Sequence, residues 1–276
     1  NVTIRVRIGD EDERFFNGFI SRFSQQGNDT GLANYRATMV PWLWFLSRTT
    51  DCRIFQNLSI PDIIKKIFSD LGFSDYKFNL KGTYQPWDYC VQYRETDLNF
   101  VARLMEQEGI FYYFDHEEKK HTLVIADAPS VHQPCSGQST VKWNPQGSGN
   151  LDESVVTDLQ LNQEFRPGKY AICDYNFETP STSLMAQVNT TIAGGNNTKF
   201  EIYDYPGEYD TKGDGDTLVK VRMQEEEAQH LEVSGSSSCR TFTSGYRFTL
   251  AEYFRPDMNR DYLLTNVHHS ASVGNS

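Results

Sequence analysis

The sequence has 276 residues, of which 38% are hydrophobic and 13% aromatic, so it can build a hydrophobic core and differs from disordered chains. Its formal net charge is −11 and its lysines and arginines form no long runs, which disfavours nucleic acid and anionic lipid surfaces as partners. No apolar run approaches the roughly 20 residues that a membrane helix needs, so we expect no stable membrane anchor.

The five cysteines lie far apart and form no C-x-x-C motif. This spacing argues against a disulfide framework and against a zinc knuckle. We expect the thiols to be reduced and mostly buried. Cys90 is expected on the buried face of a strand, opposite the face of Tyr89.

The first part of the chain is typical of antiparallel sheet. Residues 2–8 alternate apolar and polar side chains, which predicts a strand. Residues 14–26 and 34–47 are further strand-like runs, with the turn sequence GNDTG between them. Because the chain begins inside a strand, we expect it to be a piece of a longer protein.

The third of these strand-like runs contains the aromatic sequence VPWLWFLSR. On a strand, Trp42 and Trp44 would share one face, and Leu43 and Phe45 would share the other. Apolar residues on both faces predict a strand buried on both sides, by the core and by a neighbouring domain or subunit. Packing within the core alone is the alternative that the sequence leaves open.

Two helices are predicted next. The first covers residues 60–71, and Gly72 supplies its C-terminal stop. Ser59 is the expected N-cap, with Asp62 at the capping-box position. The second helix is predicted to start near Thr96 and to end at the glycine of the sequence EQEG. Its expected apolar face consists of Leu98, Val101, Ala102 and Met105.

The segment FYYFDHEEKKHTLVIAD, residues 111–127, predicts a β-hairpin with the charged tip HEEKK. It also contains His116, Glu117 and His121, which raises the question of a zinc protease motif. That motif places two histidines four apart on one helix face, whereas these are five apart and flanked by strand-forming residues. We therefore expect no metal here, and a metalloenzyme that uses both histidines is the weaker alternative.

The second half of the chain is also predicted to be mostly strands. Residues 134–150 are rich in Pro, Gly and Ser and are expected to form a linker or long loop. Residues 189–198 are expected to form a flexible tip, and a helix is predicted from about Thr217 to Glu232. The strand-like runs are residues 154–163, 169–178, 236–242, 246–254 and 261–273.

The search for chemical motifs yields no catalytic, metal-binding or cofactor-binding residue. Residues 210–216, DTKGDGD, depart from an EF-hand loop at its third and twelfth positions, so we expect a solvated turn. His268 and His269 are neighbours on a predicted strand and would point to opposite faces. The sequence has no nucleophile elbow, dinucleotide-binding loop or phosphate loop, so we expect neither an enzyme nor a cofactor.

Longer stretches of the sequence resemble one protein family. The runs YRATMVPWLWFLSRTTDCRIFQNLSIPDII and YCVQYRETDLNFVARLMEQEGIFYYF, followed by HTLVIAD, are similar to VgrG, the spike proteins of the type VI secretion system. The later pieces DYNFETP, YDYPGEY, GSSSCRTFTSGYRFTL and RPDMNRDYLLTNVHHSAS agree with this. VgrG proteins in turn resemble the baseplate hub of contractile-tailed phages.

The resemblance implies a structural hub without enzymatic activity. Three subunits, each with two barrel-like domains, would form a pseudo-hexameric ring that stacks on the hexameric tube of haemolysin-coregulated protein. Additional strands before this chain, and a needle after it, would complete the protein. A PAAR-class tip and effectors would join through that C-terminal part. The particle would assemble in the bacterial cytoplasm and then be secreted or injected into target cells.

The resemblance also implies a mainly β fold with α+β parts. Residues 1–56 would form a first barrel-like hub domain, 57–128 an α/β domain, 129–150 a linker, and 151–276 a second barrel-like domain with a helical insertion near 217–232. The candidate packing or interface anchors are Trp42, Trp44, Phe45, Tyr93 and Arg94.

One alternative function comes from a different class. A β-domain rich in aromatic residues could bind glycan or peptidoglycan through exposed aromatics in a groove. That hypothesis requires tryptophans such as Trp42 and Trp87 to face solvent.

Overall fold

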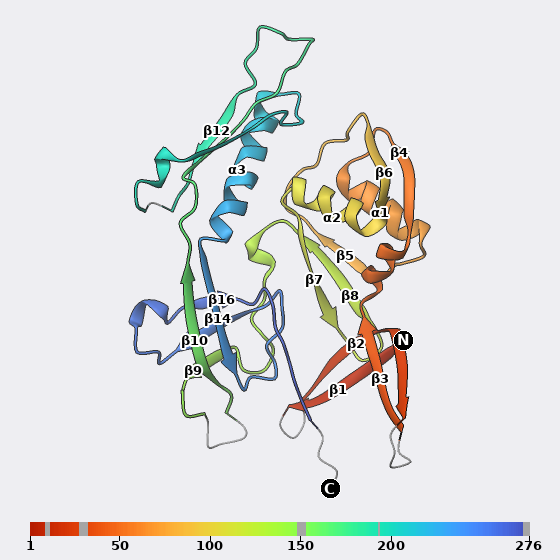
Figure 1. Ribbon diagram of the computed structural model, residues 1–276, viewed down its shortest axis with the longest axis vertical. Coiled ribbons are helices and arrows are strands. Elements are labelled where there is room, and N and C mark those ends of the chain that lie inside the picture. Colours follow the sequence, from red (N-terminus) through yellow and green to blue (C-terminus); the bar gives the residue numbers. More distant parts are fainter. Residues whose placement is uncertain (9–11, 28–32, 148–152, 193, 273–276) are drawn as a thin grey trace. The chain divides into compact units, whose positions relative to one another are not determined.

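Figure 1 presents the computed structural model, which describes residues 1–8, 12–27, 33–147, 153–192 and 194–272. Strands outnumber helices, so the predicted mainly β class with some helices is confirmed. The chain divides into two compact units. The first unit comprises residues 1–106, 110–156 and 238–276, and the second comprises residues 107–109 and 157–237. In the described part of the chain, no helix has the length and apolar character needed to cross a membrane.

The first unit begins with a three-stranded antiparallel sheet. Its strands are β1 (Val2–Ile8), β2 (Asp12–Gly27) and β3 (Ala33–Val40), in the order β1-β2-β3. The pairing of β2 with β3 shifts at a bulge between Ile20 and Arg22. The first two predicted strands are confirmed, whereas most of the predicted GNDTG turn lies outside the described residues.

The third predicted strand ends much earlier than the sequence suggested. After Val40 the chain forms the 3₁₀-helix η1 (Trp42–Arg48), in which the N–H of Trp44 donates to the carbonyl of Pro41 at 3.1 Å. Proline has no N–H for a strand ladder, and its fixed φ suits the start of a helical turn. The prediction of a strand with apolar residues on both faces was therefore wrong.

The helix α1 (Ile60–Asp70) confirms the predicted caps. The Oγ of Ser59 accepts a hydrogen bond from the N–H of Asp62. At the other end Gly72 has φ +75°, its N–H donates to Ser69, and the N–H of Phe73 donates to the carbonyl of Phe68. This pair of bonds closes the helix as a Schellman motif. The fully buried side chains of α1 are Ile60, Ile63, Ile64, Ile67 and Phe68.

The helix α2 (Asp97–Gln107) has a different buried face from the one predicted. Val101 and Met105 are buried as expected, and Leu98 is half-buried, but Ala102 is exposed. At 100° per residue the helix turns Phe100 and Leu104 towards the core instead. The helix follows β6 (Cys90–Thr96), which pairs antiparallel with β4 (Thr50–Phe55). In Figure 1 both helices lie beside this strand pair.

The predicted hairpin at residues 111–127 is confirmed. Strands β7 (Phe111–His116) and β8 (His121–Ala126) pair antiparallel, and β5 (Tyr76–Asn79) pairs parallel with β8. Residues 123–126 of β8 are completely buried. The main hydrophobic core of the first unit lies between this sheet, the two helices and η1.

The remaining strands of the first unit include part of the expected linker. Strand β9 (Thr140–Trp143) pairs parallel with β15 (Arg247–Ala251), which pairs antiparallel with β16 (Asp261–Leu263). Residues 134–147 are thus partly ordered as a strand, and residues 148–150 lie outside the described residues. The strand expected at residues 261–273 ends at Leu263, so the placement of His268 and His269 on a strand was wrong.

The second unit packs one helix on a small sheet. Strands β11 (Lys169–Ile172), β12 (Ala186–Asn189) and β13 (Glu201–Asp204) have the order β12-β11-β13. The helix α3 (Lys212–Ala228) contributes Val219 to their shared core. The other strands of this unit are the larger part of β10 (Val155–Gln163), and β14 (Leu231–Ser237), which lie next to each other.

The start of α3 corrects two predictions. The Oγ of Thr211 accepts a hydrogen bond from the N–H of Asp214 and caps a helix that begins at Lys212, five residues before the predicted start at Thr217. The DTKGDGD stretch, expected to be a solvated turn, therefore mostly forms the first turn of α3. Glu232, expected in this helix, lies in β14. The short 3₁₀-helices are η2 (Pro129–Val131), η3 (Asn197–Lys199) and η4 (Pro256–Met258).

Candidate functional site

The predicted anchor residues fall into two groups in the structure. Trp42, Trp44 and Phe45 lie together in η1, where Trp42 is 2% exposed and the other two are half-buried. Tyr93 and Arg94 lie on β6, and both are exposed. A role for these residues in contacts between subunits stays a prediction.

The environment of Trp42 contradicts the glycan-binding alternative. Its indole ring packs edge-on against Phe68 at 4.9 Å and stacks on Phe73 at 4.7 Å, and its Nε1 donates to the carbonyl of Asp75 at 3.2 Å. Trp87 is half-buried against the same core. A sugar-binding aromatic must present its face to solvent, and Trp42 cannot. Trp42 is a core residue whose polar atom is satisfied.

The two histidines of the hairpin connect three parts of the first unit. His116 lies opposite His121 at the ends of β7 and β8, with ring centroids 5.9 Å apart. The N–H of Trp42 donates to Nε2 of His121 at 2.8 Å, and Nδ1 of His121 lies 2.8 Å from Oδ1 of Asn17. The N–H of Asn17 donates to Nδ1 of His116 at 3.2 Å. His121 thus joins β8 to η1 and to β2.

These contacts determine the protonation of His121. Because Nε2 accepts from a backbone N–H, the single proton of the neutral ring lies on Nδ1 and is donated to Asn17. Both ring nitrogens are therefore used by the protein, and no lone pair remains for a metal. The geometry contradicts the zinc alternative, and the described residues contain no group of three His, Cys, Asp or Glu arranged around a metal position.

Burial also changes the acidity of both rings. Desolvation, and after it the neighbouring His116, lower the pKa of His121 to about 4, against an opposing effect of Asp75. Burial likewise lowers the pKa of His116. Both rings are consequently neutral at pH 7. The prediction that HEEKK is a charged tip holds for its last four residues, which are exposed, whereas His116 takes part in the internal network.

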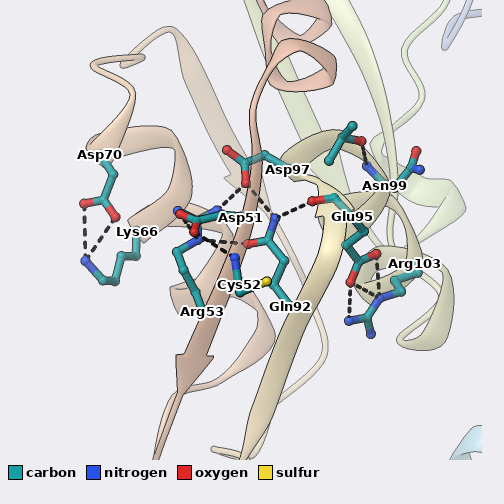
Figure 2. A network of polar contacts seen from close by, with 11 residues as sticks. Asp51, Cys52, Arg53, Lys66, Asp70, Gln92, Glu95, Asp97, Asn99 and Arg103 are labelled. Carbon is teal, nitrogen blue, oxygen red and sulfur yellow. Dashed lines mark hydrogen bonds and ion pairs between the residues drawn. The ribbon is translucent and has the colours of Figure 1, made fainter.

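A second buried polar network ties β4 and β6 to the start of α2 (Figure 2). Asp97 is 2% exposed, and its carboxylate accepts hydrogen bonds from Arg53 and, at 2.8 Å, from Nε2 of Gln92. The Nε of Arg53 donates in turn to Oε1 of Gln92 at 2.8 Å. Asp97, Gln92 and Arg53 therefore each form a hydrogen bond with both of the other two residues. The carboxylate also lies in the first turn of α2, where the helix dipole favours negative charge.

The opposite face of the β4–β6 pair is apolar and exposed. Tyr93 is 64% exposed and Ile54 is 59% exposed, and the register of the two strands places them on the same face. The guanidinium carbon of Arg94 lies 5.1 Å from the centroid of the Tyr93 ring. Tyr89 is exposed and Cys90 is buried, which confirms the prediction for this cysteine. The outward side of these strands is therefore a candidate contact surface.

Arg14 attaches the C-terminal segment of the first unit to the N-terminal sheet. Its guanidinium donates to the carbonyl of Arg240 and lies 2.9 Å from Nε2 of His269. It also stacks over the ring of Phe16 at 4.4 Å. Nε2 of His269 lies 2.8 Å from the carbonyl of Phe242. Two segments more than 200 residues apart in sequence are thus held together by one half-buried cation.

Sequence reasoning missed the polar residues that hold these networks together. Asn17 offers a signal, because it interrupts the apolar run FFNGF in the middle of a strand. Asp97 offers a weaker signal, because an acidic residue at the start of a predicted helix is usually exposed. Gln92 and Arg53 become recognisable only when the register of β4 and β6 is known.

Comparisons with known proteins identify the fold and the family. The family described as phage tail baseplate hub (GPD) matches residues 1–275. Over 268 residues the chain is 40% identical to the type VI secretion system spike protein VgrG1c of Pseudomonas aeruginosa. That match covers 97% of this chain and 37% of the relative, so the chain spans well under half the length of this curated protein.

Solved structures agree with this assignment at the level of the fold. A component of the E. coli type VI secretion system, described as similar to the T4 bacteriophage tail proteins gp27 and gp5, aligns with a TM-score of 0.64 and 19% identity. The alignment covers 91% of this chain and 55% of that one. The 43 kDa tail protein of prophage MuSo2 from Shewanella oneidensis aligns with a TM-score of 0.61 and 13% identity, over 95% and 81% of the two chains.

The match to the hub family extends over almost the entire chain, and so does the match to the spike protein. The fold comparison leads to tail and secretion proteins as well. The chain belongs to the phage tail baseplate hub family, and its resemblance to the VgrG spike proteins of the type VI secretion system is confirmed.

Proposed function

We propose that this chain is the hub of a type VI secretion spike, in which three copies close into a pseudo-hexameric ring. The observation that carries the proposal is the hub family match over residues 1–275, together with 40% identity to a spike protein. Residues 1–56 and 151–276 supply the two barrel-like parts of each subunit. Residues 57–128 form an α/β domain on the outside of the ring, and residues 129–150 connect the parts.

The ring docks on the hexameric tube of haemolysin-coregulated protein and carries the needle. A PAAR-class tip and effectors attach through the C-terminal part of the complete protein. The particle assembles in the bacterial cytoplasm and is secreted or injected into target cells. The chain needs neither a cofactor nor catalysis for this role, because a hub acts through its shape and its contacts.

Exposed apolar residues in the first unit support an assembled state. Val2 and Ile4 of β1 are 40% and 52% exposed, and Tyr93 and Ile54 form the apolar face described above. The outer edges of β1 and β3 pair with no other strand among the described residues. Apolar surface and open strand edges favour association, and a closed symmetric ring would cover both.

Docking on the tube can be tested by mixing the chain with purified haemolysin-coregulated protein. Co-sedimentation and electron microscopy should show rings of this chain stacked end to end on tube rings. A matched reaction with bovine serum albumin in place of the tube protein controls for nonspecific association. Failure of the two proteins to associate at tens of micromolar concentration would refute the docking role.

A further inference from the structure

The ribbon formed by β2 and β3 carries a polar, cationic face. Beyond the bulge in β2, Arg22 pairs with Thr38, and Ser24 pairs with Arg36. Side chains that pair directly, or that lie two residues apart on one strand, point to the same face of a sheet. These four residues therefore stand together, and they line a cleft of about 220 Å³.

Among the described residues, no carboxylate pairs with either arginine of this cleft, unlike other arginines of the first unit. Arg53 and Arg103 bind carboxylates of Asp97 and Glu95. Within the described residues, neither the guanidinium of Arg22 nor that of Arg36 forms an ion pair or hydrogen bond, although the chain has 37 acidic residues against 26 basic ones. Two planar guanidinium groups beside the hydroxyl of Thr38 form a cluster of donors suited to carboxylates, whereas the Ser24 hydroxyl donates to the carbonyl of Arg36 at 3.5 Å.

The other face of the same ribbon is aromatic. The rings of Phe23 and Tyr35 stack across the strands with centroids 5.7 Å apart, and the two residues are 65% and 61% exposed. A two-stranded ribbon with an exposed aromatic pair is marginally stable alone in water. Two cations with no partner among the described residues, and exposed rings on the same ribbon, together indicate a surface that another protein covers.

We propose that the Arg22–Arg36 face of the ribbon binds surface carboxylates of a second copy of this chain. Charge complementarity between this local cationic patch and acidic surface groups favours this occupant, because each copy has 37 acidic residues and so offers many carboxylates. A nucleic acid fits poorly, since two arginines are few for a phosphate backbone. The inference rests on the proposed function, because it assigns the ribbon to the contact between neighbouring subunits of the ring.

A charge-reversal series tests this contact. The double variant Arg22→Glu/Arg36→Glu would place carboxylates against the carboxylates of the second copy. The double variant Arg22→Lys/Arg36→Lys keeps the positive charges and loses only the planar guanidinium group, which can bind a carboxylate with two hydrogen bonds. The matched control, Lys119→Glu/Lys120→Glu, makes the same change in net charge on the exposed turn between β7 and β8. All four side chains are exposed, so urea unfolding should show unchanged stability for each variant.

Sedimentation velocity over a concentration series then measures self-association. We expect the double glutamate variant to raise the dissociation constant roughly tenfold or more, while the lysine variant and the control stay within about threefold of the wild type. Raising the salt concentration should weaken the wild type more than the glutamate variant, because salt screens the attraction that the variant has already lost.

Two outcomes would overturn the inference. Only the second of them would also overturn the proposed ring. If the wild type forms trimers and the double glutamate variant forms them equally well, the ribbon is not the contact, and the proposed hub stands. If the wild type shows no self-association at any concentration, the inference and the proposed ring both fail.

Discussion

The ring of His121 accepts a hydrogen bond from the backbone N–H of Trp42 at 2.8 Å, at the residue where the expected strand gives way to η1. The same ring donates to Asn17 in β2 from its other nitrogen. A protonated His121 would place a second N–H against the N–H of Trp42, and one of these two buried donors would lose its partner. Neutral His121 is therefore a requirement of this fold.

This relationship predicts that acid destabilises the protein through His121. The unfolded ring binds a proton near pH 6.5, and the folded ring does so only at about pH 4. Between these values the unfolded state holds more protons, so the stabilisation is fully present above about pH 6.5 and is lost as the pH falls towards 4. Urea unfolding should show a loss on the order of 2 kcal/mol across this window, after allowance for solvent screening.

A variant series separates the contribution of His121 to the loss of stability in acid from that of the carboxylates, which also titrate there. The variant His121→Gln should lose stability at pH 7 and show a shallower decline between pH 6.5 and pH 4 than the wild type. The exposed His268 provides the control, since His268→Gln should keep the wild-type profile. An unchanged slope in His121→Gln would show that this ring is not the source of the acid sensitivity.

The buried network of Figure 2 predicts that Asp97 contributes strongly to the stability of the fold. The variant Asp97→Ala leaves Arg53 without its carboxylate and Gln92 without its acceptor, so we expect a loss of about 3 kcal/mol in the free energy of unfolding. Asp70→Ala breaks only the exposed pair with Lys66 and should cost less than about 1 kcal/mol. Equal losses in the two variants would contradict the network's contribution to stability.

The end of α1 predicts a purely conformational effect at Gly72. A Cβ built there meets no atom within 4 Å, but φ is +75°, which L-residues rarely adopt. Gly72→Ala should therefore lower the stability by about 1 kcal/mol without any steric clash. Gly27 is equally open and has no positive φ, so Gly27→Ala should be nearly neutral in the same unfolding assay. A neutral Gly72→Ala would mean that the helix end adapts without strain.

The exposed face of β4 and β6 predicts an effect on assembly and none on folding. Tyr93→Ser removes an exposed ring and should change the free energy of unfolding by less than about 0.5 kcal/mol. Trp42→Ala removes a buried ring and should cost about 3 to 5 kcal/mol. If Tyr93 is an interface anchor, Tyr93→Ser weakens self-association at unchanged stability. Wild-type association in that variant would remove Tyr93 from the set of anchors.

Elements with local signals were predictable from the sequence. The cap at Ser59, the stop at Gly72 and the hairpin around residues 117–120 depend on contacts between residues close in the chain, and the structure confirms them. The start of α3 was missed, although Thr211 and Asp214 have a suitable capping spacing, because two glycines in the first turn argued against a helix.

The candidate site depends on contacts between distant residues and could not be derived in this way. The partners of His121 lie 79 and 104 residues away in sequence, and those of Arg14 lie more than 220 residues away. Pro41 was a local signal for the start of η1, but a strand and a 3₁₀-helix are both compatible with the run WLWFLSR until the packing of Trp42 is known. The family resemblance supplied the function that no local motif could.

The absolute mass of the purified wild-type chain in solution, measured by multi-angle light scattering at increasing concentration, tests the proposed ring most directly. A trimeric hub predicts a species with three times the mass of one chain, increasingly populated as the concentration rises. A mass that stays at one chain, or that settles at two, would contradict a trimeric hub.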